Sequence, residues 1–93
     1  LLSEPHTSVT LRIVMEELVI KILAEELKRG PESIKLTDSL TKDLRVDSLD
    51  TVEVVMRLEQ EIGATLLWDE ISDVSDVQSI VALATKMQGR KKA

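Results

Sequence analysis

The chain has 93 residues, enough for one compact domain, and it contains no cysteine and a single histidine. Disulfide frameworks, thiolate metal sites, cysteine nucleophiles and histidine-based catalytic relays are therefore excluded. The net charge of −5 argues against nucleic acid as a partner, and the aromatic content of 1% means that aliphatic side chains must form nearly the whole core.

The first predicted element is a long amphipathic helix that begins at Val9, after a flexible lead over residues 1–8. Its apolar residues recur every three or four positions, which is the period of one helix face. They are Leu11, Val14, Met15, Leu18, Val19, Ile22, Leu23 and Leu27. We expect Thr7 or Ser8 to cap the start and Gly30–Pro31 to end the helix, because proline cannot continue the hydrogen-bond ladder.

A long connection follows, over about residues 32–46. Connections of this length are uncommon in compact domains unless they have a function or are held down by packing. Apolar residues at regular spacing alternate here with turn-forming polar residues: Ile34, Leu36, Leu40 and Leu44. The spacing predicts that the connection packs over a helical core.

The second predicted helix begins near Asp47–Ser48 and ends at Gly63. Asp47 is a good N-cap residue, and Asp50 stands three positions later, where a second acid completes a capping box. The stripe predicted to be buried consists of Val54, Val55, Leu58 and Ile62. These features predict a well-defined helix whose first turn carries Ser48.

A short helix is predicted within residues 68–74, and Ser75–Asp76 is predicted to cap a last helix that Gly89 stops. The inward residues of that helix are Val77, Ile80, Val81, Ala84 and Met87. Residues 89–93 form a predicted basic tail. With no strand pattern, we expect an all-α four-helix bundle of three main helices and one short helix, with a long loop between the first and second.

The charge is unevenly distributed along the chain. Between positions 43 and 76, ten acidic residues are opposed only by Arg45 and Arg57. This segment predicts a strongly acidic surface that attracts basic partner proteins, although a solvated helix face would have the same composition. No apolar run is long enough to span a membrane and no secretory signal is evident, so we expect a cytoplasmic protein with no membrane insertion.

Ser48 is the candidate functional residue. It stands in the first turn of a helix, where unpaired backbone N–H groups and the helix dipole favour a phosphate ester on its hydroxyl. No histidine or lysine lies close enough in sequence to serve as a base, so Ser48 is better suited to modification by another protein than to attack unaided. A plain helix cap is the structural alternative. A calcium loop starting at Asp43 is excluded, because Arg45 and Ser48 occupy positions that need an oxygen ligand and glycine.

The run Asp47-Ser48-Leu49-Asp50-Thr51-Val52-Glu53, preceded by Asp43-Leu44, resembles the attachment motif of acyl carrier proteins, which are phosphopantetheine-binding carrier proteins. The resemblance extends from about Val9 to Met87 and implies an acyl carrier domain over residues 9–88. It implies a non-enzymatic carrier in which Ser48 bears a 4′-phosphopantetheine arm, derived from coenzyme A, that holds acyl intermediates as thioesters.

The same resemblance implies roles for two further sets of residues. The set that docks partner enzymes is Asp47, Leu49, Asp50, Val52, Glu53, Met56 and Glu59. The set that lines an acyl pocket is Leu40, Leu44, Val54, Leu58, Leu66, Ile71 and Val74. The implied partners are a phosphopantetheinyl transferase and acyl-loading and acyl-processing enzymes with basic docking patches, and the carrier is expected to be a monomer that holds no metal.

Some positions depart from the family pattern, and some alternatives stay open. Arg45 stands where carriers commonly have glycine, and Leu40 where an aromatic residue is common. Trp68 is expected to fill core or interface space. Val52 and Met56 are either docking contacts or ordinary half-buried side chains.

The cargo implied by the resemblance is a fatty-acid, polyketide or specialised lipid intermediate. The alternatives are a peptidyl or aminoacyl carrier domain and a structural or regulatory helical subunit with the carrier fold.

Overall fold

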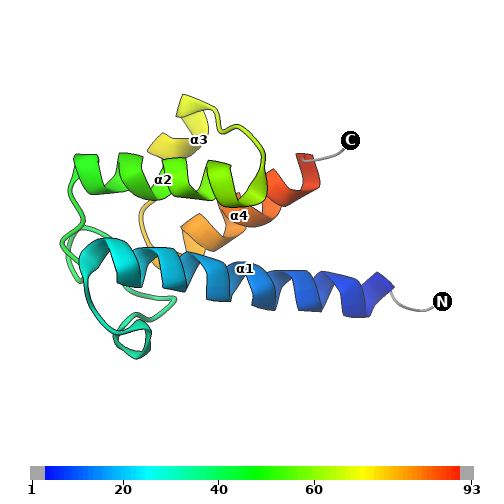
Figure 1. Ribbon diagram of the computed structural model, residues 1–93, viewed down its shortest axis with the longest axis horizontal. Helices are drawn as coiled ribbons and strands as arrows, with labels where there is room; N and C mark the ends of the chain where they lie inside the picture. Colours follow the sequence, from blue (N-terminus) through cyan, green and yellow to red (C-terminus); the bar gives the residue numbers. More distant parts are fainter. Residues whose placement is uncertain (1–3, 91–93) are drawn as a thin grey trace.

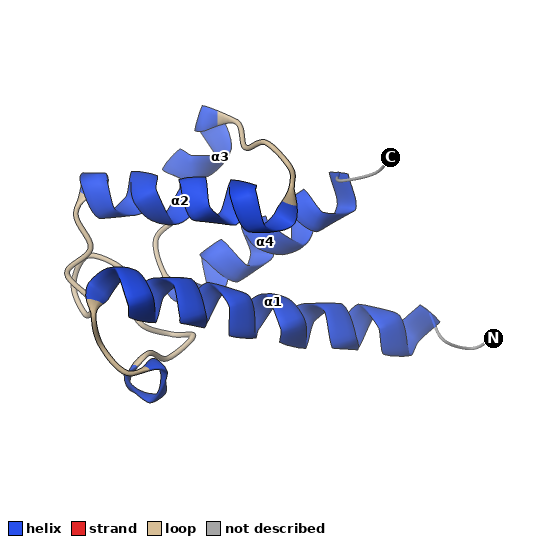
Figure 2. Cartoon of the chain, viewed as in Figure 1, coloured by secondary structure: helices blue, strands red, loops and turns tan. Residues whose placement is uncertain are grey.

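The computed structural model describes residues 4–90, and this part of the chain is helical (Figure 1, Figure 2). The elements are α1 (Glu4–Leu27), a short 3₁₀ helix η1 (Pro31–Ser33), α2 (Ser48–Ile62), α3 (Trp68–Ser72) and α4 (Val77–Arg90). Within residues 4–90 no strand forms, and a single isolated β-bridge joins Ser39 to Asp76. The predicted all-α bundle of three main helices and one short helix, with a long loop after the first, is confirmed.

The core lies where α1, α2 and α4 meet. α1 and α2 run antiparallel, and α4 contacts both of them (Figure 1). The residues with no exposed surface come from all three helices: Val19, Ile22, Leu23, Leu58, Val77, Ala84 and Met87. Aliphatic side chains therefore form the core, as the near absence of aromatic residues requires. The side chain of Trp68 and its predicted filling role lie outside the described part of the chain.

The predicted limits of α1 were wrong at both ends. The helix begins at Glu4 rather than Val9, so residues 4–8 are not a flexible lead and neither Thr7 nor Ser8 caps the start; residues 1–3 lie outside the described part. The helix ends at Leu27 because Lys28 takes a left-handed conformation (φ 57°), and the N–H of Arg29 then donates to the carbonyl of Ala24 at 3.0 Å. Gly30 is extended and only precedes the 3₁₀ turn at Pro31.

The burial of α1 also differs from the prediction at one position. Val14, expected on the buried stripe, is exposed, whereas Met15, Val19, Ile22 and Leu23 are buried. The reason is geometric, because the four buried residues lie within one face and Val14 lies outside it at 100° per residue. The apolar stripe predicted from the sequence was therefore wider than the buried face of α1.

Hydrogen bonds attach the long loop to the start of α4. The N–H of Leu40 donates to the carbonyl of Ser75 at 3.0 Å, and the N–H of Val77 donates to the carbonyl of Asp38 at 3.1 Å. Ile34, Leu40 and Leu44 are buried beneath these bonds. The expectation that the loop packs over the helical core is confirmed.

The C-terminal helix runs past its predicted stop. Asp76 caps α4 by accepting the N–H of Ser79 at 2.9 Å, as expected, but the helix continues through Gly89 to Arg90. The guanidinium of Arg90 binds the carboxylate of Glu70 in α3, with Nη1 to Oε1 at 2.9 Å. Arg90 thus belongs to the fold rather than to a basic tail, and residues 91–93 lie outside the described part.

Among the described helices, none is at once long and apolar enough to cross a bilayer.

The Glu70–Arg90 contact predicts a specific loss of stability in acid. The Arg90 guanidinium, together with the N–H of Leu67, lowers the pKa of Glu70 to about 2. Because this folded pKa lies below the unfolded value, the contribution is fully present above about pH 4.5 and is lost as the pH falls toward 2. Glu70→Gln should therefore destabilise the protein near neutral pH and cost progressively less in acid, as measured by urea unfolding over a pH series. A constant difference from the parent at all pH values, or the same trend in the exposed control Glu61→Gln, would contradict the assignment.

Candidate functional site

Ser48 is the first residue of α2, and its neighbours provide the helix cap. Asp47 is the N-cap, with its Oδ1 accepting the N–H of Asp50 at 2.8 Å, and the carboxylate of Asp50 accepts the N–H of Asp47 in return at 3.4 Å. The predicted capping box is therefore confirmed. The alternative in which Ser48 is itself the cap is wrong, because Asp47 has that role. Ser48 is exposed, so its hydroxyl is accessible to another protein.

The residues that precede Ser48 form a strained turn. Arg45 adopts a left-handed conformation with φ 57°. This conformation costs a residue other than glycine about 1–2 kcal/mol. The need for positive φ accounts for the glycine that the resemblance to acyl carrier proteins places here. Val46, next in the chain, is buried and its N–H donates to the carbonyl of Leu40 at 2.7 Å, which anchors the approach to α2.

Acidic and apolar side chains share the solvent face of α2. Asp47 and Glu53 are exposed and Asp50 is half-buried. Leu49 and Met56 expose 66% and 51% of their surface. We call these five residues the α2 face. The structure brings these five predicted docking residues together, and it places Val52, the sixth, half-buried at the edge of the face.

Glu59, the seventh predicted docking residue, also makes a tertiary contact. It is half-buried, and its Oε2 accepts the N–H of Leu66 at 2.8 Å. At 100° per residue it lies about 60° from Met56, and the two side chains line the same groove at the end of α2. The carboxylate of Glu59 thus holds the connection between α2 and α3, a tertiary role that its spacing in the sequence did not indicate.

Glu53 stands next to a glutamate of α1. A side-chain hydrogen bond and charge repulsion with Glu26 raise the pKa of Glu53 above its ordinary value, with smaller contributions from burial, Asp50 and Asp47. Arg57 binds Glu25 at 2.8 Å and Glu26 at 3.5 Å. The charge of the α2 face is therefore concentrated around its first two turns, close to Ser48, while Arg57 compensates the acids of α1.

A small apolar cavity lies beneath the start of α2. Its lining includes three predicted pocket residues, Leu40, Val54 and Val74, and five further aliphatic residues and one threonine that the sequence reasoning missed: Leu23, Val46, Thr51, Val55, Ile80 and Leu83. Its volume is about 10 Å³. A cavity of this size holds about one water molecule at most, so it is closed to an acyl chain in this conformation.

The other predicted pocket residues are not in the cavity lining. Leu44, Leu58 and Leu66 are buried in the core and Ile71 packs against it half-buried. The signal that could have identified part of the missed lining is the helical spacing from Ser48 to Thr51, which places Thr51 one turn after the serine. A groove of about 490 Å³ adjoins the cavity through Leu40, Thr51 and Val74, and its outer edge carries hydroxyl groups.

These features fit a covalently attached phosphate ester. Ser48 is exposed, stands in the first helix turn where backbone N–H groups lack helical partners, and is preceded by a cap that does not use its hydroxyl. Among residues 4–90, no group of three or more histidine, aspartate or glutamate side chains is arranged to hold a metal ion. The chemistry of the site is thus that of an accessible attachment point.

Two comparisons with known proteins agree with this chemistry. The family model described as the phosphopantetheine attachment site matches residues 17–84. The crystal structure of an acyl carrier protein from Thermotoga maritima has a TM-score of 0.75 to this chain, with 22% sequence identity, and covers 88% of this chain and 95% of that one. The chain therefore belongs to the family of phosphopantetheine-binding carrier domains, and it has the fold of an acyl carrier protein. Such a domain is the site of covalent 4′-phosphopantetheine attachment and is a carrier domain rather than a catalytic one.

Proposed function

We propose that Ser48 is the attachment residue and that the chain carries acyl intermediates as thioesters, presenting them to separate enzymes. The single observation that supports this most is the exposed hydroxyl of Ser48 at the first position of α2, with Asp47 rather than Ser48 capping the helix. The proposed carrier domain extends over residues 9–88, and its first helix, α1, begins before it, at Glu4.

Loading is a group transfer onto the Ser48 hydroxyl. Its oxygen forms a bond to the phosphorus of the 4′-phosphate in coenzyme A, the bond from that phosphorus to the 3′,5′-ADP oxygen breaks, and the hydroxyl proton passes to a base of the transferase. The resulting phosphodiester is an anion at the start of α2, where the helix dipole stabilises it. When attached, the arm supplies a terminal thiol that holds the acyl group as a thioester.

Partner docking on the α2 face supports the transient contacts that a carrier needs. Carboxylates near Ser48 attract basic patches on a transferase and on acyl-processing enzymes, and charge complementarity raises association rates more than final affinity. Leu49 and Met56 add apolar contact area beside the charges. The tethered arm gives the acyl group a high local concentration at each docked active site.

The proposed cargo is an acyl group from fatty-acid, polyketide or specialised lipid synthesis in the cytoplasm. The groove beside Leu40, Thr51 and Val74 is the nearest space for it, and the small cavity beneath would have to widen to admit a chain. Intact-mass analysis of the protein purified from its native host identifies the loaded group. Recovery of an amino acid instead of an acyl chain would support the peptidyl carrier alternative.

The attachment site is tested with the purified protein, coenzyme A and a broad-specificity phosphopantetheinyl transferase. We expect a mass gain of one phosphopantetheinyl group, located by peptide mapping on the fragment that contains Ser48. A gain on a fragment without Ser48 contradicts the assignment of the residue. No gain with several transferases contradicts the proposed carrier function.

Reversing one charge on the α2 face should slow loading. We expect Glu53→Lys to lower kcat/KM for the transferase roughly tenfold at low salt, at the lower end of what electrostatic steering supplies. The loss should shrink as salt is added, because screening removes the long-range part of the attraction. The same substitution replaces repulsion of Glu26 by attraction, so the fold is not weakened and a folding defect cannot explain the slower reaction.

The control for this prediction is Glu32→Lys, which makes the same charge change at an exposed position in η1, away from α2. Its kcat/KM should stay within about twofold of the parent, since only local charge steers docking. Equal losses in the two variants would show that net charge, rather than the α2 face, sets the rate.

A further inference from the structure

α1 has a second line of apolar residues beside its buried face. Val9 and Ile13 expose 54% and 48% of their surface, and the same line continues to Ile20, which is half-buried, and to Ala24, which is buried but lines a groove. At 100° per residue these four side chains lie within about 60° of one another and about 120° from the centre of the buried face of α1. Figure 1 shows the N-terminal turns of α1 extending beyond the ends of α2 and α4. We call these four residues the outer stripe.

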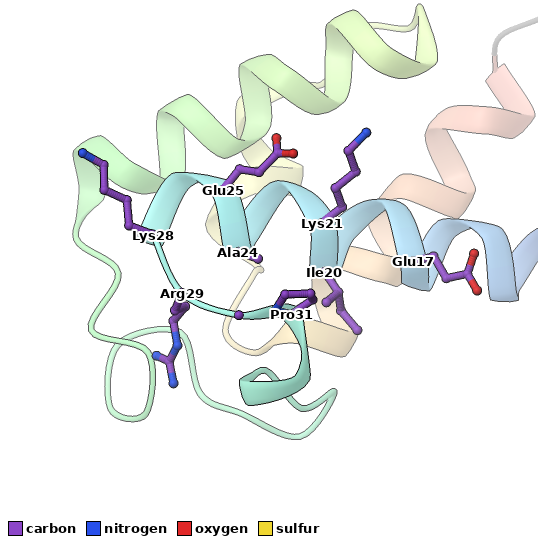
Figure 3. A pocket seen from close by; sticks show the side chains of 9 residues that line it. Glu17, Ile20, Lys21, Ala24, Glu25, Lys28, Arg29 and Pro31 are labelled. Carbon is purple, nitrogen blue, oxygen red and sulfur yellow. The ribbon is translucent and has the colours of Figure 1, made fainter.

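The outer stripe leads into a groove on the described part of the chain. Its volume is about 630 Å³, and it lies between the second half of α1 and the segment that turns at Gly30–Pro31. Ile20, Ala24 and Pro31 supply its apolar lining (Figure 3). Together, stripe and groove run from Val9 to Ala24, about 22 Å along the helix axis. That length is about four helical turns, which suits a helix lying alongside α1.

The charges around this groove are mainly positive. Lys21, Lys28 and Arg29 line it, against Glu17 and Glu25 (Figure 3). The carboxylate of Glu25 is bound by Arg57 of α2 at 2.8 Å, so it is already compensated. The groove therefore has an excess of positive charge in a protein whose net charge is −5, and it is opposite in sign to the α2 face.

We propose that the outer stripe and its groove bind an acidic amphipathic helix of a partner protein. The apolar face of that helix would pack against Ile13 and Ile20, and its carboxylates would approach Lys21, Lys28 and Arg29. The stripe lies along one side of α1, where a partner helix can lie alongside it, and charge at the flanks of helix pairs selects the partner. Because this surface is separate from Ser48 and the α2 face, such a partner can stay bound while acyl-processing enzymes exchange.

The charge pattern of α1 argues against a second copy of the chain as the occupant. An antiparallel pairing that sets Ile13 of one copy against Ile20 of the other brings Glu16 and Glu17 of both copies together at the centre. Like charges opposed in a helix pair are unfavourable. An acidic helix from another protein avoids this arrangement by placing its carboxylates at the basic end.

The proposal is tested with a synthetic peptide of about three heptads that has leucine at the a and d positions, glutamate at the flanking e and g positions of the end that faces Lys21, Lys28 and Arg29, and glutamine at the other flanking positions. Its own charge repulsion keeps this peptide from pairing with itself. Titrated into the full chain, it should shift NMR signals of Val9, Ile13 and Ile20, and fluorescence anisotropy should show binding that weakens with salt. Ile20→Glu, and separately Lys21→Glu with Lys28→Glu, should each weaken binding about tenfold or more.

Controls separate this surface from the carrier site. Met56→Glu, on the α2 face, and Ser48→Ala should leave binding of the acidic peptide unchanged, so the result does not depend on the proposed attachment site. Ile13→Glu is the second stripe variant, since its exposed position leaves the core untouched if Ile20→Glu disturbs folding.

Three results would overturn the proposal. One is no binding of the acidic peptide, or binding that shifts signals of Leu49 and Met56 instead. Another is a dimer in sedimentation equilibrium that Ile13→Glu dissociates, which would make a second copy the occupant. The third is binding to vesicles of anionic phospholipid, lost in the Lys21→Glu, Lys28→Glu variant, in place of binding to the peptide.

Discussion

Ser48→Ala is expected to abolish attachment of the phosphopantetheinyl group completely. The reaction needs the hydroxyl oxygen as the atom that bonds to phosphorus, and alanine has no substitute for it. The fold should be retained, because Asp47 and Asp50 provide the cap of α2 and the Ser48 side chain is exposed. Intact-mass analysis measures the loss, and urea unfolding should show a stability within about 0.5 kcal/mol of the parent.

The matched control is Ser75→Ala, an exposed serine that precedes α4. This variant should be loaded at the parent rate, because its hydroxyl is not at the start of α2. If Ser48→Ala still gains the phosphopantetheinyl mass, the attachment residue is another one. If the unloaded variant supports growth of a host that depends on the protein, the structural-subunit alternative becomes the better account.

Leu58→Ala should have the largest effect on stability. Leu58 is fully buried in α2, among residues of α1 and α4. Truncating such a leucine removes buried apolar surface and leaves a cavity, at a cost of about 2–5 kcal/mol. A domain of this size is stable by about 5–14 kcal/mol, so the variant loses a large share of its stability. Urea unfolding followed by circular dichroism measures the change.

The comparison variant is Leu67→Ala, which makes the same chemical change at a side chain that is exposed in the loop before α3. Its stability should change by no more than about 0.5 kcal/mol. A loss below about 1 kcal/mol in Leu58→Ala would mean that the core refills the space easily. The resemblance to acyl carrier proteins places Leu58 in the acyl pocket. A small loss of stability in Leu58→Ala would favour that role, because it would show that neighbouring side chains rearrange readily at this position.

The distribution of surface chemistry suggests two separate uses for the two sides of the domain. The α2 face, next to Ser48, is acidic with two exposed apolar side chains. The outer stripe on α1 is apolar and ends in lysine and arginine residues. Because the two surfaces carry opposite charge, a protein that binds one surface would be repelled by the other. This separation is what a carrier needs if it is held by one protein while it serves others.

Local signals were sufficient for the existence and order of the helices, for the limits of α2 and for the candidate residue. The period of the apolar residues and the Asp47–Asp50 capping box predicted α2, and Gly63, left-handed at φ 82°, ends it as expected. These features depend on neighbours within about one turn, so the linear order of residues contains them. At 100° per residue Ser48 lies within about 20° of the buried Val55, so the exposure of Ser48 follows from its place at the very start of α2 and not from the apolar pattern.

Contacts distant in sequence decided several features that the sequence pattern does not contain. Gly89 was expected to end α4, but the helix continues to Arg90, whose guanidinium binds Glu70, twenty positions away. The carboxylate of Glu59, to which the family resemblance gives a docking role, also binds the N–H of Leu66, a contact that the sequence pattern does not contain. The acyl-pocket set was implied by the family resemblance, whereas the cavity lining depends on how three helices and the long loop converge.

The order of residues alone predicts an all-α domain with a modifiable serine at the start of a helix, because periodicity and capping act over a few positions. Only the packed chain decides which aliphatic residues enclose space, which carboxylates are already bound, and that α1 keeps an uncovered apolar side. Those properties depend on distances between segments far apart in the chain, and local preferences do not encode such distances.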